Sequence, residues 1–215
     1  DNYSINLKAG DRDIELILYD TAGKEEYDRL RPLDYAEAGV FIVLFSIDSP
    51  ESYDHVAEKW YPELQHFRPD VPILLVGNLA EKRLDKQSVQ DLLKKNQNLI
   101  TYEQGVSLAK KIGAVGYWEC SPGHLLGVKD VFENAVLSVI KPKAVHGFTK
   151  EDCFRMALEL CTLNKNFYLD FSQWHSTTYN GMKILVNHLQ NNNVTILIDN
   201  ENNAEKDIIF ILNIL

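Results

Sequence analysis

Two continuous apolar runs, separated by an amphipathic segment, constrain the fold of this chain more than any other feature. The runs are "VFIVLFSI" at Val40–Ile47 and "PILLVGN" at Pro72–Asn78. Strands of parallel sheets are apolar on both sides, so we expect each run to be a strand buried on both faces. Between them, Ser49 and Pro50 are start signals for a helix that continues to Glu63. The order predicts an α/β fold, with a mostly parallel sheet and helices on both of its faces.

The remainder of the first 140 residues continues this alternation. The stretch "YSINLKAGDRDIELILYD" predicts two strands around a turn at Ala9-Gly10-Asp11, since apolar residues alternate in its second half. "SVQDLLKKNQ" predicts a short polar helix, and "TYEQGVSLAKKIG" a longer one that begins at the Thr101 cap and ends at Gly113. "GYWECS" predicts a last strand, and "GVKDVFENAVLSVI" a closing amphipathic helix.

The charge and the apolar content limit the class of partner. The formal net charge is −9, and both nucleic acid and anionic lipid favour basic surfaces, so neither is expected to be the main partner. Three cysteines without the spacing of a disulfide framework indicate a reducing compartment, and we expect a cytoplasmic location. The longest apolar run, Ile208–Leu215, is too short to span a bilayer and contains Asn213.

The character of the sequence changes after Lys143. The remainder is rich in asparagine and ends in apolar runs. This composition indicates either an appendage or disordered polar sequence with strand-forming segments. We therefore predict a domain over residues 1–143 and an Asn-rich C-terminal extension over residues 144–215.

Polar residues and glycines follow three of the predicted strands, and ligands of open parallel sheets bind at such ends. Asp20-Thr21-Ala22-Gly23 follows the second strand, Gly77-Asn78 follows "ILLV", and Cys120-Ser121 follows "GYWE". A carboxylate such as Asp20 can hold a magnesium-bound water, and Gly23 lets a backbone N–H approach a phosphate. Each segment alone is also compatible with a plain turn. Their order and spacing together are the more specific signal.

"DTAGKEEYDRLRPLDY" at Asp20–Tyr35 resembles the second switch of the Rho family of Ras-like small GTPases, usually Asp-Thr-Ala-Gly-Gln, acidic residues and Arg-Leu-Arg-Pro-Leu. "DNYS" is similar to the end of the first switch, "DKQSVQDLLKKNQNLIT" to the family's extra helix, and "YEQGVSLAKKIGAVGYWECS" to the region that ends in its guanine loop. The resemblance covers residues 1–141. It implies a Ras-like P-loop NTPase fold with six strands and five helices. It also implies GTP or GDP bound with Mg²⁺, and a role in signal transduction and regulation of the actin cytoskeleton.

The resemblance also assigns roles to individual residues. Asp20, Thr21, Ala22 and Gly23 would lie at the terminal phosphate, with Asp20 reaching Mg²⁺ through water. The residues around the base would be Asn78, Glu81, Ser121 and Pro122. Lys24 occupies the catalytic position at which the family has the Gln that orients the attacking water.

Departures from the family pattern predict an impaired site. No Gly-x-x-x-x-Gly-Lys-Ser/Thr loop is present, since no two of the eleven glycines stand five positions apart. We therefore expect the phosphate loop, the first strand and the first helix to be missing. Lys24 has donors but no acceptor with which to activate water. In the guanine motif Leu79 replaces lysine, Glu81 is one methylene longer than aspartate, and Pro122 has no N–H to offer a base. We expect weak GTP binding and negligible hydrolysis.

A missing first strand would leave a slot between "IELILY" and "VFIVLF" in the centre of the sheet, and such open strand edges favour aggregation. One hypothesis is that "VTILID" or "IIFILNIL" from the C-terminal extension enters this slot. The alternative is that the extension is unrelated to the sheet.

Three interpretations are open from the sequence. The first is a Rho-type guanine-nucleotide switch, incomplete as it stands. The second is a non-catalytic pseudo-GTPase or scaffold that binds effectors, exchange factors or GTPase-activating proteins through the second switch. Its expected contacts are Tyr27, Leu30, Arg31 and Leu33, since aromatic, Arg and apolar groups dominate interfaces. The third is a truncated or misjoined gene product. We expect no lipid anchor, because "ILNIL" is not a prenylation box and no polybasic stretch precedes it.

Overall fold

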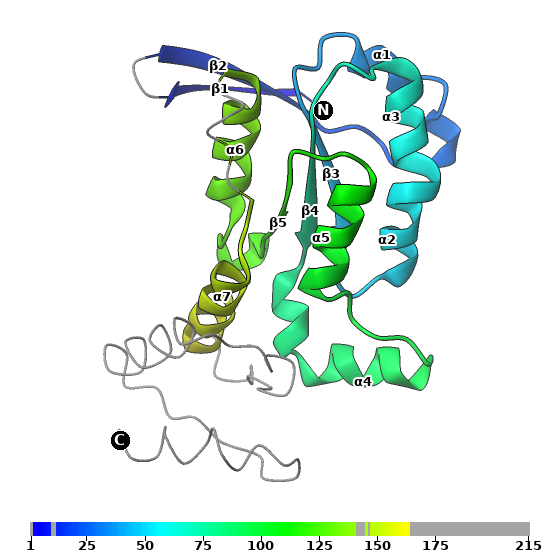
Figure 1. Ribbon diagram of the computed structural model, residues 1–215, viewed down its shortest axis with the longest axis vertical. Coiled ribbons are helices and arrows are strands. Elements are labelled where there is room, and N and C mark those ends of the chain that lie inside the picture. Colours follow the sequence, from blue (N-terminus) through cyan, green and yellow to red (C-terminus); the bar gives the residue numbers. More distant parts are fainter. Residues whose placement is uncertain (1, 10–11, 141–144, 146, 164–215) are drawn as a thin grey trace.

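The computed structural model describes residues 2–9, 12–140, 145 and 147–163, and it has the α/β architecture that the sequence predicts (Figure 1). The strands are β1 (Asn2–Ala9), β2 (Arg12–Tyr19), β3 (Phe41–Ser46), β4 (Ile73–Asn78) and β5 (Gly116–Glu119). The helices are α1 (Arg31–Tyr35), α2 (Pro50–His55), α3 (Tyr61–Phe67), α4 (Lys86–Lys94), α5 (Tyr102–Lys111), α6 (Val128–Ile140) and α7 (Lys150–Leu163). Short 3₁₀ turns form η1 (Glu25–Tyr27), η3 (Ala80–Leu84) and η4 (Pro122–His124), and η2 (Val56–Trp60) is a π-helical turn.

The strands form two separate sheets. Strands β3, β4 and β5 make a parallel sheet with β4 in the centre, and Phe41 of β3 is opposite Ile73 of β4. Strands β1 and β2 form an antiparallel hairpin, which confirms the two strands expected at the start of the chain. In the part of the chain that the structure describes, β2 is not hydrogen-bonded to β3, so each of these strands has one edge without a strand partner.

The interpretation of Val40–Ile47 as a strand buried on both faces is wrong in one respect. Strand β3 lies at an edge of its sheet, and the Leu44 side chain is 53% exposed. In contrast, β4 is buried along its length until Asn78. The hydrophobicity of a run predicts that it is a strand. Whether other strands and helices cover that strand depends on its place in the sheet.

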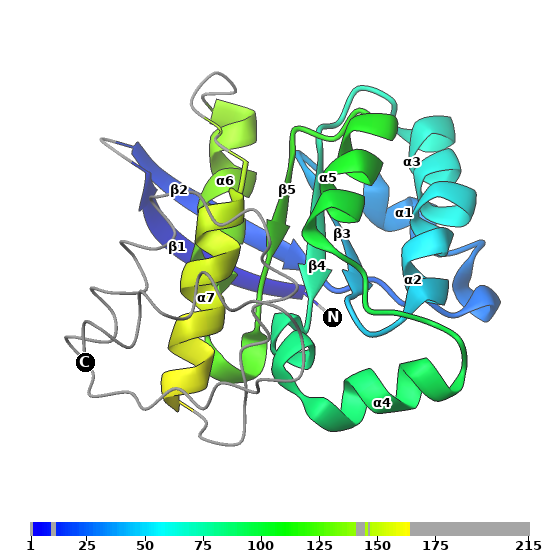
Figure 2. The same ribbon diagram turned by 60° about the horizontal axis from the view of Figure 1, so that its bottom comes forward.

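Helices cover both faces of the parallel sheet, as the sequence predicts (Figure 2). On one face Phe45 and Leu75 belong to a core that includes residues of α3 and α5. On the other face Leu74 and Trp118 pack with residues of α6. Alternate side chains of β4 therefore contribute to two different cores, as expected for a central strand.

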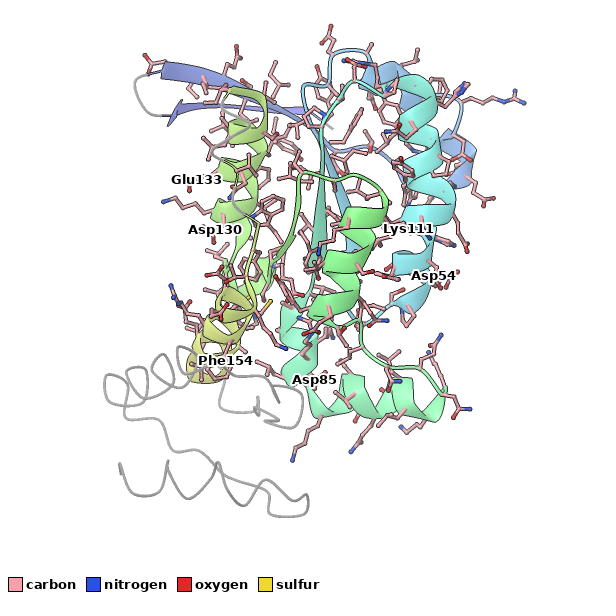
Figure 3. The ribbon with its side chains drawn as sticks, in the orientation of Figure 1. Asp54, Asp85, Lys111, Asp130, Glu133 and Phe154 are labelled. Atoms are coloured by element: carbon pink, nitrogen blue, oxygen red, sulfur yellow. The ribbon has the colours of Figure 1, made fainter. Side chains whose placement is uncertain are left out.

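The predicted helix starts are confirmed by their caps. The Ser49 hydroxyl accepts a hydrogen bond from the backbone of α2, and Thr101 forms a capping box with Gln104 at the start of α5. Asp85, at the junction of η3 and α4 in Figure 3, accepts from two backbone N–H groups of α4. Gly113 follows α5 with a φ of 64°, the left-handed conformation in which glycine ends a helix.

Helix α7 lies in the segment that the sequence assigns to the C-terminal extension, in which no helix is predicted. Before it begins, the N–H of Phe148 donates to the carbonyl of Tyr117 at 3.0 Å, so the chain covers the outer edge of β5. Phe154 of α7 (Figure 3) and Leu160 are buried in the main core. The apolar runs at 194–199 and 208–215 lie outside the described residues, and the domain boundary after residue 143 stays a prediction.

Among the helices of the described ranges, none combines the length and the apolar character that crossing a membrane requires.

Candidate functional site

The loops that follow β4 and β5 are fastened to each other. Cys120 follows β5, and its backbone N–H donates to the carbonyl of Gly77 at 3.0 Å. Its own carbonyl accepts from the N–H of Ala80, also at 3.0 Å. The Cys120 thiol donates to the Oδ1 atom of Asn78 over 3.6 Å. The structure thus brings together the ends of two strands that the sequence marks as candidate binding loops.

Asn78 shapes the loop after β4. Its Oδ1 atom also accepts from the N–H of Leu79 at 2.8 Å, and Leu79 has a φ of 58°. A left-handed conformation is uncommon for a residue with a branched side chain and costs roughly 1–2 kcal/mol. Within the described part of the chain, the amide nitrogen of Asn78 has no hydrogen bond. The strained turn therefore leaves a donor group at the end of β4.

Glu81 brings an acceptor to the same loop. Its Oε2 atom is buried and has no hydrogen-bond partner among the described residues. Buried polar atoms in proteins are almost always hydrogen-bonded, so this oxygen is suited to a ligand that carries N–H donors, as the edge of guanine does. Burial, and next the carboxylates of Glu81 and Glu119, raise the pKa of the Cys120 thiol to about 12. Two carboxylates thus act on the Cys120 thiol, and one of them, Glu119, is paired with Arg83.

Ser121 and Pro122 offer little to a base. The N–H of Ser121 donates to the carbonyl of Leu126 at 2.9 Å, and its hydroxyl lies 2.9 Å from Nδ1 of His124. Pro122 begins η4 and has no N–H.

A buried ion pair connects η3, which follows β4, to the end of β5. Arg83, in η3, donates to Oε1 of Glu119 at 2.8 Å and to the carbonyl of Ile100 at 2.7 Å. Glu119 is 1% exposed and also accepts from the Tyr117 hydroxyl (2.7 Å) and the Cys153 thiol (3.3 Å). Sequence reasoning missed this network. The available signal was the acidic residue at the end of the buried "GYWE" strand, which requires a partner.

The segment after β2 is held by other contacts. Arg31 donates from Nε to the carbonyl of Ala22 at 2.9 Å and from a terminal nitrogen to the carbonyl of Lys24 at 3.2 Å. It also forms two hydrogen bonds with the Glu63 carboxylate, at 2.8 and 2.9 Å, and lies over the Trp60 ring. Arg31 therefore fixes Ala22–Lys24 beside α3.

The resemblance assigns Asp20 to the terminal phosphate and Asn78 to the base of one nucleotide, and this shared site stays a prediction. The loop after β2 leads to η1 and α1 beside α3, in the upper part of Figure 1, whereas β4 ends lower in the view, above η3 and α4. Thr21 is half-buried, and Asp20, Ala22, Gly23 and Lys24 are exposed. The structure thus assembles Asn78, Glu81 and Ser121, and it holds Ala22–Lys24 through a separate set of bonds.

The second-switch segment presents an apolar surface. Leu33 is 72% exposed, and Tyr27 and Leu30 are exposed as well. Arg31, expected from the sequence to contact a partner, is only 4% exposed. Its guanidinium is satisfied by groups of the chain itself, so Arg31 holds the segment in place. The partner contacts expected at Tyr27, Leu30 and Leu33 stay predictions.

Two groups of candidate residues differ in what they offer a ligand. The loop after β4 has the Asn78 amide as a donor and the unpaired Glu81 oxygen as an acceptor. The segment Asp20–Lys24 is mostly exposed, and the printed sequence has no Gly-x-x-x-x-Gly-Lys-Ser/Thr pattern of the kind that cradles phosphates. The assignment of these residues to a nucleotide stays a prediction.

In a comparison with known protein families, the Ras family matches residues 1–141.

Proposed function

Because the chain belongs to the Ras family, we propose that it is a Rho-type guanine-nucleotide switch with low nucleotide affinity. Membership of the family implies binding of GTP or GDP with Mg²⁺ and control by effectors and regulators. The Rho-type assignment is supported by the resemblance of Asp20–Tyr35 to that subfamily's second switch. It is also supported by α4, which would correspond to the subfamily's extra helix. On this proposal the protein acts in signalling to the actin cytoskeleton.

The observation that carries the proposal is the unpaired Oε2 atom of Glu81. It lies in the loop after β4, close in sequence to the Asn78 amide, at the end of a parallel strand where ligands of such sheets bind. A guanine edge would supply the missing N–H donors.

The low affinity follows from the phosphate side. A hydrogen bond to a charged group contributes roughly 1.5–3 kcal/mol, so losing about five or six of them removes on the order of 10 kcal/mol. A site of picomolar strength, about 16 kcal/mol, would then bind in the micromolar to millimolar range. Lys24 at the position of the water-orienting Gln has no acceptor. We therefore expect negligible hydrolysis.

Guanosine binding tests the role of Glu81. Guanosine is expected to shift the backbone resonances of Asn78, Glu81 and Cys120, and Glu81→Ala should weaken its binding by about tenfold or more, because a charged acceptor is lost. Glu81→Asp should retain or improve binding, since the shorter side chain matches the family pattern. The measurement is a titration followed by two-dimensional NMR.

Lys82→Ala, in the same turn, is the matched control and should bind guanosine as the unmodified chain does. Adenosine is the control ligand, because its edge lacks the N–H pair that Glu81 would accept. Equal responses to guanosine and adenosine, or an unchanged affinity in Glu81→Ala, would contradict the proposal.

A second candidate function, a scaffold without nucleotide control, is favoured by the exposure of Tyr27, Leu30 and Leu33. Here we expect an effector domain to be captured equally with and without added GTP, and Leu33→Ser to reduce capture strongly. A switch requires capture that depends on nucleotide. A quantitative pull-down with a purified GTPase-binding domain therefore separates the two candidates, with Lys94→Ala on α4 as the surface control.

A further inference from the structure

Helix α7 packs on the core although it lies beyond the residues that match the Ras family. The match covers residues 1–141, whereas α7 spans Lys150–Leu163. Phe154 (Figure 3) and Leu160 are each 1% exposed and belong to the core that also contains Leu75 of β4. Because these side chains are buried, α7 is held in a defined place and can act on the elements that it touches.

The start of α7 is attached to β5 and α5. The N–H of Phe148 donates to the carbonyl of Tyr117 at 3.0 Å, and the carbonyl of Phe148 accepts from the Tyr102 hydroxyl at 2.7 Å. The Nζ atom of Lys150, the first residue of α7, lies 2.7 Å from a carboxylate oxygen of Glu103. These three contacts fix where the helix begins, and none of them involves the loop after β4.

Further along, α7 lies against η3, the turn that carries both Glu81 and Arg83. The Cys153 thiol of α7 donates to Oε2 of Glu119 at 3.3 Å. The Glu119 carboxylate also accepts from both terminal nitrogens of Arg83, with 2.8 Å for the bond to Oε1. Burial, and next the charge of Glu119, raises the pKa of Cys153 well above its usual range, so the thiol keeps the proton that it donates.

The conformation of η3 depends on contacts at both of its ends. The turn follows Leu79, whose φ of 58° lies in the left-handed region. A strained residue keeps such a conformation only where the surrounding structure holds it. Near the other end of the turn, Arg83 is anchored to Glu119. Glu81 lies between these two points, so the anchor at Arg83 bears on where the Glu81 carboxylate is held.

We propose that α7 positions the base-binding turn: through Glu119 and Arg83, Cys153 holds η3 in the conformation that presents Glu81 to a guanine base. The inference rests on the proposed binding of that base by Glu81. Cys153 is a positioning residue, since it acts through other residues rather than by touching the base. Loss of its contact lets η3 take other conformations and lowers the affinity for the base, although every group that contacts the base is still present.

Guanosine titrations followed by NMR test this role in two backgrounds. Cys153→Ala should weaken guanosine binding by about 3- to 10-fold, the effect of one hydrogen bond. Cys153→Ser keeps a donor and should bind guanosine as the unmodified chain does. In a Glu81→Ala background, Cys153→Ala should cause no further loss, because the group that it positions is gone. Arg155→Ala, at an exposed position of α7, is the matched control and should leave the affinity unchanged.

Amide hydrogen exchange of η3 is a second readout that needs no ligand. The N–H of Lys82 donates to the carbonyl of Leu79, and that of Asp85 to the carbonyl of Lys82. Both amides should exchange about 3- to 10-fold faster in Cys153→Ala than in the unmodified chain or in Cys153→Ser. The amide of Leu75 in β4 reports whether the sheet stays intact. Unchanged exchange at Lys82 and Asp85 would overturn the inference.

The outcomes of the titrations separate this inference from the proposed function. Guanosine binding that Cys153→Ala does not weaken would overturn the positioning role and leave the role of Glu81 standing. Equal losses in both backgrounds would also overturn it, because a general loss of stability acts in both alike; this comparison decides the question if Leu75 loses protection too. No guanosine binding by the unmodified chain would refute the proposed function and, with it, the inference.

Discussion

Replacing Arg83 by methionine is expected to lower the free energy of unfolding by about 3–5 kcal/mol. The substitution keeps the length of the side chain but leaves the Glu119 carboxylate, 1% exposed, with only the Tyr117 hydroxyl and the Cys153 thiol as donors. It also removes the hydrogen bond to the carbonyl of Ile100. A domain of this size is stable by about 5–15 kcal/mol, so the variant should lose a large fraction of its stability. Urea denaturation followed by circular dichroism measures the change.

Glu119→Gln in the Arg83→Met background provides the test of mechanism. Neutralising the stranded carboxylate should recover part of the loss, so the two substitutions are expected to be non-additive by about 1–3 kcal/mol. Lys94→Ala removes an ion pair between exposed side chains and should leave the denaturation midpoint unchanged within error. An Arg83→Met variant as stable as this control would show that the pair does not support the fold.

Gly105→Ala is expected to destabilise the protein by about 2–3 kcal/mol, although alanine is the better helix former by about 1 kcal/mol. A Cβ atom at Gly105 in α5 would lie 2.6 Å from Cε2 of Tyr117 and closer still to the end of the ring. The ring cannot withdraw easily, because it stacks on Phe45 and its hydroxyl donates to Glu119. Thermal and urea unfolding measure the change.

Ser107→Ala, at an exposed position of α5, is the matched control and should be neutral or slightly stabilising. In a Tyr117→Leu background the cost of Gly105→Ala should shrink by about 1 kcal/mol or more, since the ring is gone. An alanine at position 105 that stabilises the protein would refute the close approach of α5 to β5.

Much of the architecture could be predicted because its signals are local. Ser49 and Thr101 mark helix starts by their side chains, and the apolar run in β4 indicates a central strand. The π-helical turn at Val56–Trp60 was not predicted. It precedes Pro62, which cannot donate a backbone hydrogen bond, and the N–H of Tyr61 reaches back to Val56. Helix α7 is not predicted because the asparagine-rich composition that follows it obscures the helical signal of Lys150–Leu163.

The candidate site was harder to predict because its geometry depends on distant partners. The sequence could indicate that Asn78 and Ser121 end neighbouring parallel strands. It could not show that Arg31 is buried by Glu63, which is 32 positions away, rather than exposed for a partner. It also could not show that Leu44 lies open at the sheet edge, since hydrophobicity does not reveal which neighbours are present.

A calorimetric titration of the full chain with GTP and Mg²⁺, beside one with guanosine, tests the central claim most directly. The proposal is that Asn78 and Glu81 hold the base and that the 215 residues of this chain contain no phosphate-loop motif. It predicts dissociation constants in the micromolar to millimolar range for both ligands, with GTP at most about tenfold tighter than guanosine. Nanomolar, Mg²⁺-dependent binding of GTP would contradict it.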